Sequence, residues 1–573
     1  MLMRAAPAPL ASLAAAAAAA QLPLPLPPAL LARCRRGPQG HARRALATDA
    51  DAAAAGGGAP ELVAWVLARG GAVDGAAPAN LAGRDGGSGW GLKATRDCPA
   101  GARLVELPEG CLLTYDPEGA DPRLLALINQ VPEELWGGRL ALALLAARAA
   151  GAASPFAAYV SQLPRGFPGV PMFFSREALE AVDYPPVVEQ VKKRCRWLHR
   201  FSTDALARLP GTGDDPFAGA GVDINSLGWG LAAVTSRAFR VRGPSRPAAL
   251  LPLIDMANHS FEPNAEVLPA AGGGVAMVAK RQLSAGEPIL LSYGPLSNDF
   301  LLMDYGFLIP DNPHDRVAVR FDTGLLNAGA AVANVMDGSS FLELDASAGW
   351  KRRALEGLRL AGGGADLGVQ VGGPVPVDAR LLAAARVLAA KYQSELEGRG
   401  LEELGRWDRP LNRQNESAVL RTLLGVCSVL LSNFRTNLED DEALLAEGGG
   451  TGGGGGTGGG GSTGGAGGPQ QQQGQQLQQQ QQAQQAQQPL SEELRLAVRF
   501  RAERKRVLLR AIRALGSRAR VVAGMADLRE GPAAAPAKKG ERARPATTRG
   551  FASGGGGGSG GGKGNGRPRG GLE

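Results

Sequence analysis

The sequence predicts a mixed α+β fold, in which a β-rich core is interrupted by helices and followed by an all-α region. Three observations indicate this arrangement. Short apolar runs typical of strands occur before and after a long stretch of helical pattern, and the pattern beyond Pro310 is helical again. With 573 residues, the chain is long enough for two or three domains that each have a core.

The strand-like runs carry polar residues at their ends. Runs of this kind occur at 103–107, 250–254, 275–279 and 288–291. The run at 250–254 ends in a polar cluster that contains Asp255, Asn258 and His259, and the run at 288–291 is followed by Ser292, Tyr293 and Gly294. A buried strand that ends in polar side chains is typical of one that delivers groups to a site, so we expect a functional site here.

Helical periodicity accounts for most of the remaining pattern. Helices are expected at 61–69, 140–150, 154–163, 175–182 and 228–239, and beyond Pro310 at 379–392, 416–433 and 494–515. A basic run at 192–200 could be a solvated helix face or a nucleic-acid patch. We favour the solvated face, because the run carries one tryptophan and lies in an acidic part of the chain.

The net charge of +8 comes from the two ends of the chain. Residues 1–48 contain six arginines and no acid, and residues 501–573 contain 17 Lys or Arg against five acids. The part between them is therefore net negative. An acidic body disfavours a nucleic-acid-binding surface and suits a basic substrate segment.

Residues 1–48 are rich in Ala, Pro, Leu and Arg, which resembles an organelle transit peptide. A secretory signal with its apolar part at 10–20 is the alternative. Arginine recurs well beyond that part, so we favour the transit peptide.

Cysteine usage and hydropathy exclude several classes of protein. The five cysteines are scattered without a CxxC pair, so no zinc site, no other metal site and no disulfide framework is expected. This suits a reducing compartment. Outside the Ala- and Leu-rich start, no run of 18 apolar residues predicts a membrane span.

Two low-complexity segments are expected to be disordered, because they cannot bury enough apolar surface to fold. One is a loop at 448–488, nearly all Gly and then nearly all Gln, inserted between two helices. The other is the basic tail at 531–573.

Single motifs leave their meaning open. The glycines at 89 and 91 fit a plain hairpin or a close approach of the backbone to a ligand. Arg237, near the end of an apolar helix, needs an anionic partner, which could be a buried Asp or a ligand carboxylate. Asn258 and His259 could form a simple turn, and Tyr293 could be a core residue.

The order of the motifs is more informative than any one of them. A GxG turn at 89–91, SRAF at 236–239, NHS at 258–260, SYG at 292–294 and YGF at 305–307 together resemble a SET domain. More narrowly, residues 60–520 resemble the Rubisco large-subunit methyltransferase group. The resemblance implies a SET domain at 60–310 with an α-helical insert at about 115–235. A helical substrate-binding domain would follow at 311–520.

The resemblance also implies a reaction and a site. Members of the group transfer a methyl group from S-adenosylmethionine to a protein side chain, usually a lysine amine. The cofactor contacts would fall on Ser88, Gly89, Trp90, Arg237, Asn258 and His259. Tyr293 matches the catalytic tyrosine, and Arg237, Asp255, Tyr293 and Tyr305 would line the substrate site. Relatives often carry Glu where this chain has Ser88, so the cofactor hydrogen bond of that Glu is expected to be missing or replaced here.

We therefore expect a protein-lysine N-methyltransferase that acts on a non-histone protein in the chloroplast, the compartment favoured by analogy with the named group. A mitochondrial or cytoplasmic location is the alternative. Three other functions stay open: methylation of a protein histidine, a binding protein that uses the pocket without turnover, and nucleic-acid binding through the basic tail.

Overall fold

The structure, a computed structural model, describes residues 59–81, 89–115, 119–240, 246–337, 346–447 and 490–524. All of these residues belong to one compact unit, Met1–Ala526. The presequence at 1–48, the loop at 448–488 and the tail at 531–573 lie outside the described residues, so their expected character stays a prediction.

Two four-stranded sheets form the β-rich core. The first contains, in spatial order, β1 (Ala72–Val73), β4 (Arg103–Leu107), β9 (Val275–Ala279) and β8 (Ala265–Pro269). The second contains β2 (Ala76–Asn80), β3 (Trp90–Ala94), β10 (Pro288–Leu291) and β7 (Asn258–His259). All neighbours are antiparallel except β10 and β7, which are parallel. The second sheet thus joins strands from opposite ends of the β-rich region.

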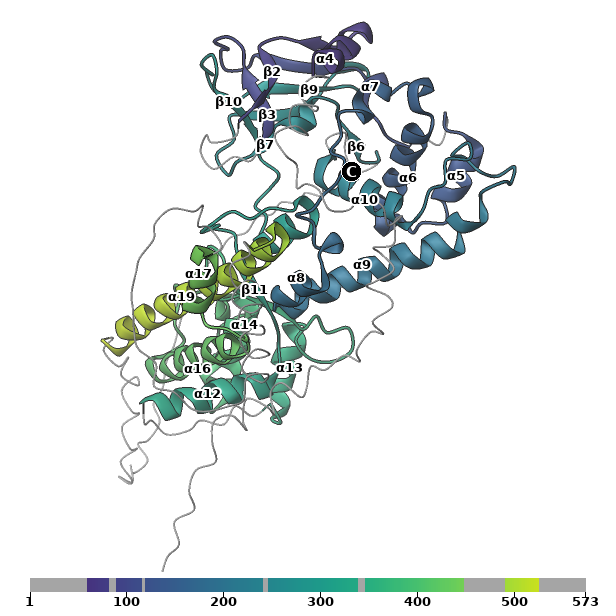
Figure 1. Cartoon of the computed structure of the whole chain (residues 1–573). Helices are drawn as coiled ribbons and strands as arrows, with labels where there is room; N and C mark the ends of the chain where they lie inside the picture. Colours follow the sequence, from purple (N-terminus) through teal and green to yellow (C-terminus); the bar gives the residue numbers. More distant parts are fainter. Residues whose placement is uncertain are drawn as a thin grey trace, which may run out of the picture. The chain divides into compact units, whose positions relative to one another are not determined.

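Helices fill the chain between β4 and the short antiparallel pair β5 (Ala238–Phe239) and β6 (Ala249–Leu250). They are α5 (Pro122–Ile128), α6 (Trp136–Ala149), α7 (Ala157–Val160), α8 (Arg176–Ala181), α9 (Pro185–Asp204) and α10 (Ile224–Arg237). Helix α10 packs against α6 and α9 (Figure 1). Its last residue is Arg237, so the helical stretch returns this side chain to the sheets.

The region beyond Pro310 is helical, as expected, with one addition. Strands β11 (Arg316–Arg320) and β12 (Gly368–Gly372) form an antiparallel pair. The helices are α12 (Thr323–Asp337), α13 (Gly349–Gly357), α14 (Ala379–Ala389), α15 (Leu401–Leu404), α16 (Arg413–Ser432), α17 (Leu438–Glu447) and α19 (Glu492–Ala523). Helix α16 packs against both α12 and α19 (Figure 1).

The predicted strands at 103–107, 275–279 and 288–291 are confirmed with the same bounds. The strand predicted at 250–254 is wrong beyond Leu250, although the run is fully buried. Pro252 lacks the amide hydrogen that a ladder needs, and Leu253 adopts a φ of 71° before a 3₁₀ turn at Ile254–Met256. The polar cluster therefore follows a turn.

The predicted helices are present, with ends that differ by several residues in places. The one expected at 154–163 is reduced to α7, because Pro155 and Pro164 restrict its two ends. Side chains that accept a backbone N–H fix the starts of other helices: Ser175 for α8, Asp223 for α10 and Ser491 for α19.

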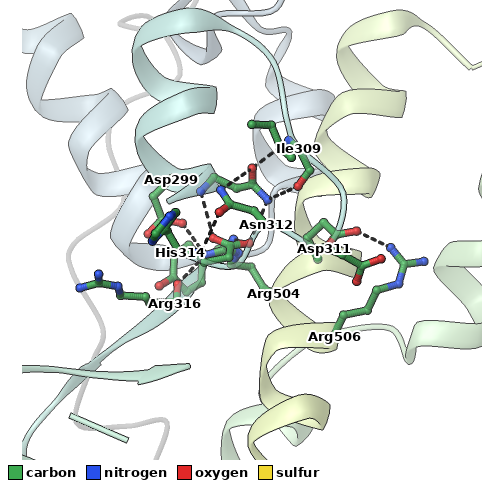
Figure 2. A network of polar contacts seen from close by, with 12 residues as sticks. Asp299, Ile309, Asp311, Asn312, His314, Arg316, Arg504 and Arg506 are labelled. Carbon is green, nitrogen blue, oxygen red and sulfur yellow. Dashed lines mark hydrogen bonds and ion pairs between the residues drawn. The ribbon is translucent and has the colours of Figure 1, made fainter. Parts of the chain in front are cut away.

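A buried charge network joins the end of the β-rich core to α19. Arg504 of α19 is fully buried and forms ion pairs with Asp315 and, at 2.6 Å, with Asp299 (Figure 2). The carboxylate of Asp315 also accepts the backbone N–H and the side-chain amide of Asn298. Burial raises the pKa of Asp299 to about 6, against the opposing charge of Arg504. The guanidinium of Arg504 therefore neutralises two carboxylates, Asp299 before Pro310 and Asp315 after it.

Candidate active site

The second sheet brings three of the sequence motifs together. Strand β10 pairs with β3, which begins at Trp90, and with β7, which consists of Asn258 and His259. In the β10–β7 pair, Leu290 lies opposite Asn258 and Leu291 opposite His259. Tyr293 follows two residues after the end of β10. The fold therefore gathers the segments around 90, 258 and 293 at one place.

Tyr293 is held by contacts to its backbone, its hydroxyl and its ring. Its hydroxyl donates to the carbonyl oxygen of Ala257 at 2.8 Å, and its backbone N–H donates to Nδ1 of His259 at 3.1 Å. Its ring stacks with those of His259 and Tyr305, at centroid distances of 5.0 and 4.9 Å. Burial raises the pKa of Tyr293, so its phenol is neutral at physiological pH and can orient a bound group by its dipole.

Aromatic rings continue on both sides of this tyrosine. Tyr305 lies 6.1 Å from Phe307, and His259 contacts Phe261, whose ring in turn lies 4.9 Å from that of His314. Tyr305 ends a single π-helical turn, Leu301–Tyr305, a distortion that is frequent at functional sites. Burial raises the pKa of Tyr305 to about 12, and the charge of Asp304 acts in the same direction. The rings form an apolar wall that can exclude water.

Arg237 meets Asp255 at the end of α10. Its Nη1 donates to the backbone carbonyl of Asp255 at 3.2 Å and lies 3.5 Å from the carboxylate oxygen Oδ2. The same Oδ2 accepts the hydroxyl of Tyr159, on α7, at 2.7 Å. Burial raises the pKa of Asp255 against the lowering effects of Arg237 and Tyr159. Of the two partners open to Arg237 in the sequence, the structure therefore supplies the buried aspartate.

Three buried polar atoms at this place have no hydrogen-bond partner among the described residues: Arg237 Nε, Asp255 Oδ1 and His259 Nε2. Because Nδ1 of His259 accepts the N–H of Tyr293, the neutral ring carries its proton on Nε2. Burial lowers the pKa of His259, which favours this neutral form. The site thus offers two donors and one acceptor to a bound molecule. A zwitterionic amino acid group, such as the one at the end of S-adenosylmethionine, fits Arg237 and Asp255, since it brings a carboxylate and an ammonium.

The GxG turn approaches the same place. Gly89 has a φ of 90°, and a Cβ there would meet nothing within 4 Å, whereas a Cβ on Gly91 would lie 2.7 Å from Nδ2 of Asn258. The close approach at Gly91 sets the position of the Asn258 amide. Ser88 lies outside the described residues, so its predicted cofactor contact stays a prediction.

Gly91→Ala is expected to weaken cofactor binding by displacing the Asn258 amide. The added Cβ would also meet Leu81 Cδ1 at 2.6 Å, so both neighbours must shift. We expect S-adenosylmethionine to bind roughly tenfold more weakly, the equivalent of about one hydrogen bond. Isothermal titration measures this. The matched control is Gly110→Ala, where a Cβ meets nothing within 4 Å; equal affinity of the two variants would contradict the placement of Asn258.

Sequence reasoning missed Tyr159, Phe261 and His314. Tyr159 lies in an apolar helical run, and periodicity alone gives a buried tyrosine a core position. Of the basic run at 192–200, Lys192 pairs with Glu189, and Arg194 pairs with Asp304 next to Tyr305. The first pair lies within α9, as on a helix face, whereas the second joins α9 to the segment Leu301–Tyr305. The solvated helix face expected for the run stays a prediction.

Other features of the described residues lie apart from this cluster. A surface cavity of about 420 Å³ is lined by residues of α6, α7, α10 and the loops after α6 and α7, including Arg148, Arg165 and Trp229, and contains none of the predicted site residues. No three His, Cys, Asp or Glu residues in the described ranges are grouped as metal ligands. Within the same ranges, every helix is too short or too polar to cross a bilayer.

Comparisons with known proteins agree with this arrangement. Residues 89–294 match the model of the SET domain, and residues 343–508 match the Rubisco LSMT substrate-binding domain. The structure is similar to the SET domain of LSMT bound to lysine and AdoHcy, with a TM-score of 0.54 and 16% identity over 82% of this chain and 92% of that one. It is also similar to Rubisco LSMT bound to AdoMet, with a TM-score of 0.53 and 16% identity over 81% of this chain and 93% of that one.

Curated relatives are named as histidine methyltransferases. Actin-histidine N-methyltransferase of Danio rerio is 26% identical over 67% of this chain, and that of Gallus gallus is 24% identical over 67%. The chain spans 62% and 63% of the lengths of these two proteins. On the two domain matches and the shared fold, the chain belongs to the SET-domain proteins that carry a Rubisco LSMT substrate-binding domain.

Proposed function

We propose that the chain is an S-adenosylmethionine-dependent protein methyltransferase whose acceptor is a lysine side chain. The observation that carries the proposal is the pairing of two features at one place. Arg237 and Asp255 offer an unpaired donor and acceptor, and the neutral, fixed phenol of Tyr293 lies among aromatic rings near the same groups. Methyl transfer from a zwitterionic cofactor requires groups that bind its amino acid end, next to an aromatic wall that orients the methyl group and its acceptor.

Residues of three segments would hold the cofactor. The backbone at Gly89 and Trp90, the Arg237 guanidinium, and Asn258 with His259 supply the contacts, and Ser88 is the remaining predicted one. When bound, S-adenosylmethionine supplies a methyl group activated by a sulfonium charge. This chemistry fits the donor and acceptor set, because the Arg237 and Asp255 groups are complementary to a carboxylate and an ammonium.

The protein's own part in the reaction is alignment and the exclusion of water. An in-line displacement at carbon needs the acceptor nitrogen, the methyl carbon and the sulfur on one line, and fixed positioning can contribute several kcal/mol. Tyr293 can supply such a fixed position, because Ala257 holds its hydroxyl and His259 holds its backbone N–H.

The acceptor amine must lose its proton before it attacks. A free lysine has a pKa of about 10.4 and is mostly protonated at neutral pH. Enclosure by Tyr293, Tyr305 and Phe307 would desolvate the ammonium and lower its pKa, so that the neutral amine is formed without a dedicated base.

Histidine is the second candidate acceptor. The names of the curated relatives favour it, and the structural neighbours, which were solved with lysine or methyllysine, favour lysine. An imidazole is already largely neutral at pH 7 to 8, so it needs less help from desolvation than an amine. The two acceptors differ in where the methyl group is found.

The test is transfer from methyl-labelled S-adenosylmethionine to the proteins of a plastid extract, with the modified peptides identified by mass spectrometry. Methyl-lysine supports the proposal, and methyl-histidine alone replaces it by the second candidate. Cofactor binding by isothermal titration without transfer to any protein would indicate a binding protein. The control is the Tyr293→Phe variant, which distinguishes transfer by this site from activity of the extract.

We also propose that the acceptor is a plastid protein. The composition of residues 1–48 supports this, as arginine without acids is typical of transit peptides. The full chain with a C-terminal fluorescent tag should enter chloroplasts of plant cells, and the same chain without residues 2–48 should stay outside. Entry into mitochondria, or no entry, contradicts the proposal.

A further inference from the structure

Tyr159 links the helical insert to the candidate active site. It lies on the short helix α7, its side chain is buried with 2% exposure, and its hydroxyl donates to Oδ2 of Asp255 at 2.7 Å. Asp255 is nearly 100 residues away in the chain, and within the described residues this bond is the one hydrogen bond of the Tyr159 side chain. A buried phenol needs a hydrogen-bond acceptor, and here that acceptor is a carboxylate of the candidate active site.

The bond leaves a defined half of the carboxylate for another group. Oδ2 of Asp255 accepts from Tyr159 and faces Nη1 of Arg237 at 3.5 Å, whereas Oδ1 is buried and has no partner among the described residues. Nη1 of Arg237 is bound to the backbone carbonyl of Asp255, and its Nε has no partner either. A buried carboxylate oxygen without a donor is costly unless a ligand satisfies it.

We propose that Tyr159 is a positioning residue that fixes the Asp255 carboxylate so that Oδ1 binds an amine of a bound molecule. This inference rests on the proposed methyltransferase function. We expect this amine to be the α-amino group of S-adenosylmethionine, because Arg237 and Asp255 fit a zwitterion, and the side-chain amine of the acceptor is the alternative. Both are nitrogen donors that would satisfy Oδ1. Tyr159 itself touches neither; it acts through Asp255.

The groups around Asp255 determine how loss of the Tyr159 hydroxyl would change the pKa of Asp255 and the pH profile of methyl transfer. The groups that face the carboxylate are Tyr159 from α7, Arg237 from α10 and Tyr293 after β10. Burial raises the pKa of Asp255, and the charge of Arg237 and the bond from Tyr159 lower it. Without the hydroxyl this pKa rises, so the carboxyl takes up its proton at a higher pH. The acid limb of the pH profile should then move to higher pH.

The experiment compares full-length wild type with Tyr159→Phe and a matched control, Tyr184→Phe. Both tyrosines are buried, with 2% and 4% exposure, and both use the hydroxyl in one hydrogen bond, but that of Tyr184 accepts the N–H of Ala318, away from the site. Each variant keeps its ring, so packing is preserved. Methyl transfer is measured from pH 5.5 to 9, together with kcat, KM for each substrate, and Tm.

We expect Tyr159→Phe to reduce kcat/KM at pH 7 by roughly 10- to 100-fold, the value of one hydrogen bond to a charged group, and to move the acid limb to higher pH. Tyr184→Phe should keep the wild-type profile. A rise in KM for S-adenosylmethionine assigns the amine to the cofactor; a rise in KM for the acceptor, or a fall in kcat alone, assigns it to the acceptor. Tyr159→Phe should have little further effect in an Asp255→Asn background, because the group through which it acts is already changed.

Two results overturn the inference alone: a Tyr159→Phe profile equal to that of an active wild type, or a loss of rate that is uniform over pH and accompanied by a lower Tm. If the wild type transfers no methyl group to any protein, the proposed function fails, and the inference fails with it. The two failures are distinguished by the wild-type assay.

Discussion

Tyr293→Phe is expected to yield a folded protein that binds S-adenosylmethionine like the wild type and transfers methyl groups at least about 100-fold more slowly, the effect of removing one fixed dipole at a transition state. The phenylalanine ring keeps its stacking on His259 and Tyr305, so the fold and the aromatic wall are retained. What is lost is the hydroxyl held by the carbonyl of Ala257. Single-turnover rates measure the chemical step, and isothermal titration measures binding.

Tyr184→Phe is the control for this variant as well, because it removes a buried hydroxyl that lies outside the site. Its rate should stay within about twofold of the wild type, because the lost hydrogen bond, to the N–H of Ala318, involves none of the candidate site residues. A Tyr293→Phe variant with near wild-type turnover would remove the catalytic assignment. Weaker cofactor binding with an unchanged chemical step would instead make Tyr293 a binding residue.

Arg504→Met is expected to destabilise the protein by about 3 to 5 kcal/mol, because it leaves buried carboxylates without their counter-charge. The side chain of Asp315 is fully buried, and Asp299 pairs with the same guanidinium of Arg504 (Figure 2). Methionine fills most of the volume of the arginine stem, so the loss is mainly electrostatic. Denaturant midpoints and Tm values measure it.

The pH dependence of this loss has a definite sign. Burial already raises the pKa of Asp299 to about 6 with Arg504 present, and without the guanidinium the pKa of Asp299 would be raised further. A raised pKa in the folded state means that stability falls as pH rises from the unfolded value of about 3.8 through the folded value. The Arg504→Met deficit should therefore be largest at pH 8 and smaller at pH 5.

Arg510→Met is the matched control, on the same helix and with the same replacement. Arg510 pairs with Asp311 at 2.9 Å, but the two side chains are 39% and 83% exposed. Exposed pairs contribute about 0 to 1 kcal/mol, so this variant should unfold close to the wild type at every pH. If the two variants lose the same stability, the network around Arg504 is not the source of its effect.

Local patterns predicted the elements, and the three-dimensional arrangement supplied the partners. The apolar runs that became β9 and β10 have the predicted bounds, since a short apolar run between turn signals defines a strand within a few residues. The run at 250–254 had the same apolar character, but Pro252 and the positive φ of Leu253 end its strand at Leu250. The burial of this run could be predicted from its apolar side chains, whereas its backbone conformation depends on the 3₁₀ turn at Ile254–Met256.

The site shows the same division. Tyr293, His259 and Asn258 could be named from the order of motifs, because their residue types and spacing are local. The partner of Arg237 could not be predicted, because a buried aspartate and a ligand carboxylate can both neutralise a guanidinium. In the structure Asp255 pairs with Arg237, and Arg237 Nε stays available to a ligand carboxylate. Tyr159 had no local signal, since its role depends on a hydrogen bond over nearly 100 residues.

The most direct test of the central claim is a crystal structure of the protein with S-adenosylhomocysteine. We predict that the amino acid end of the bound molecule contacts Arg237 Nε and Asp255 Oδ1, with its sulfur facing the Tyr293 hydroxyl. Binding elsewhere, or a site in which side chains fill the space between these groups, would contradict the proposal that these segments form one methyl-transfer site.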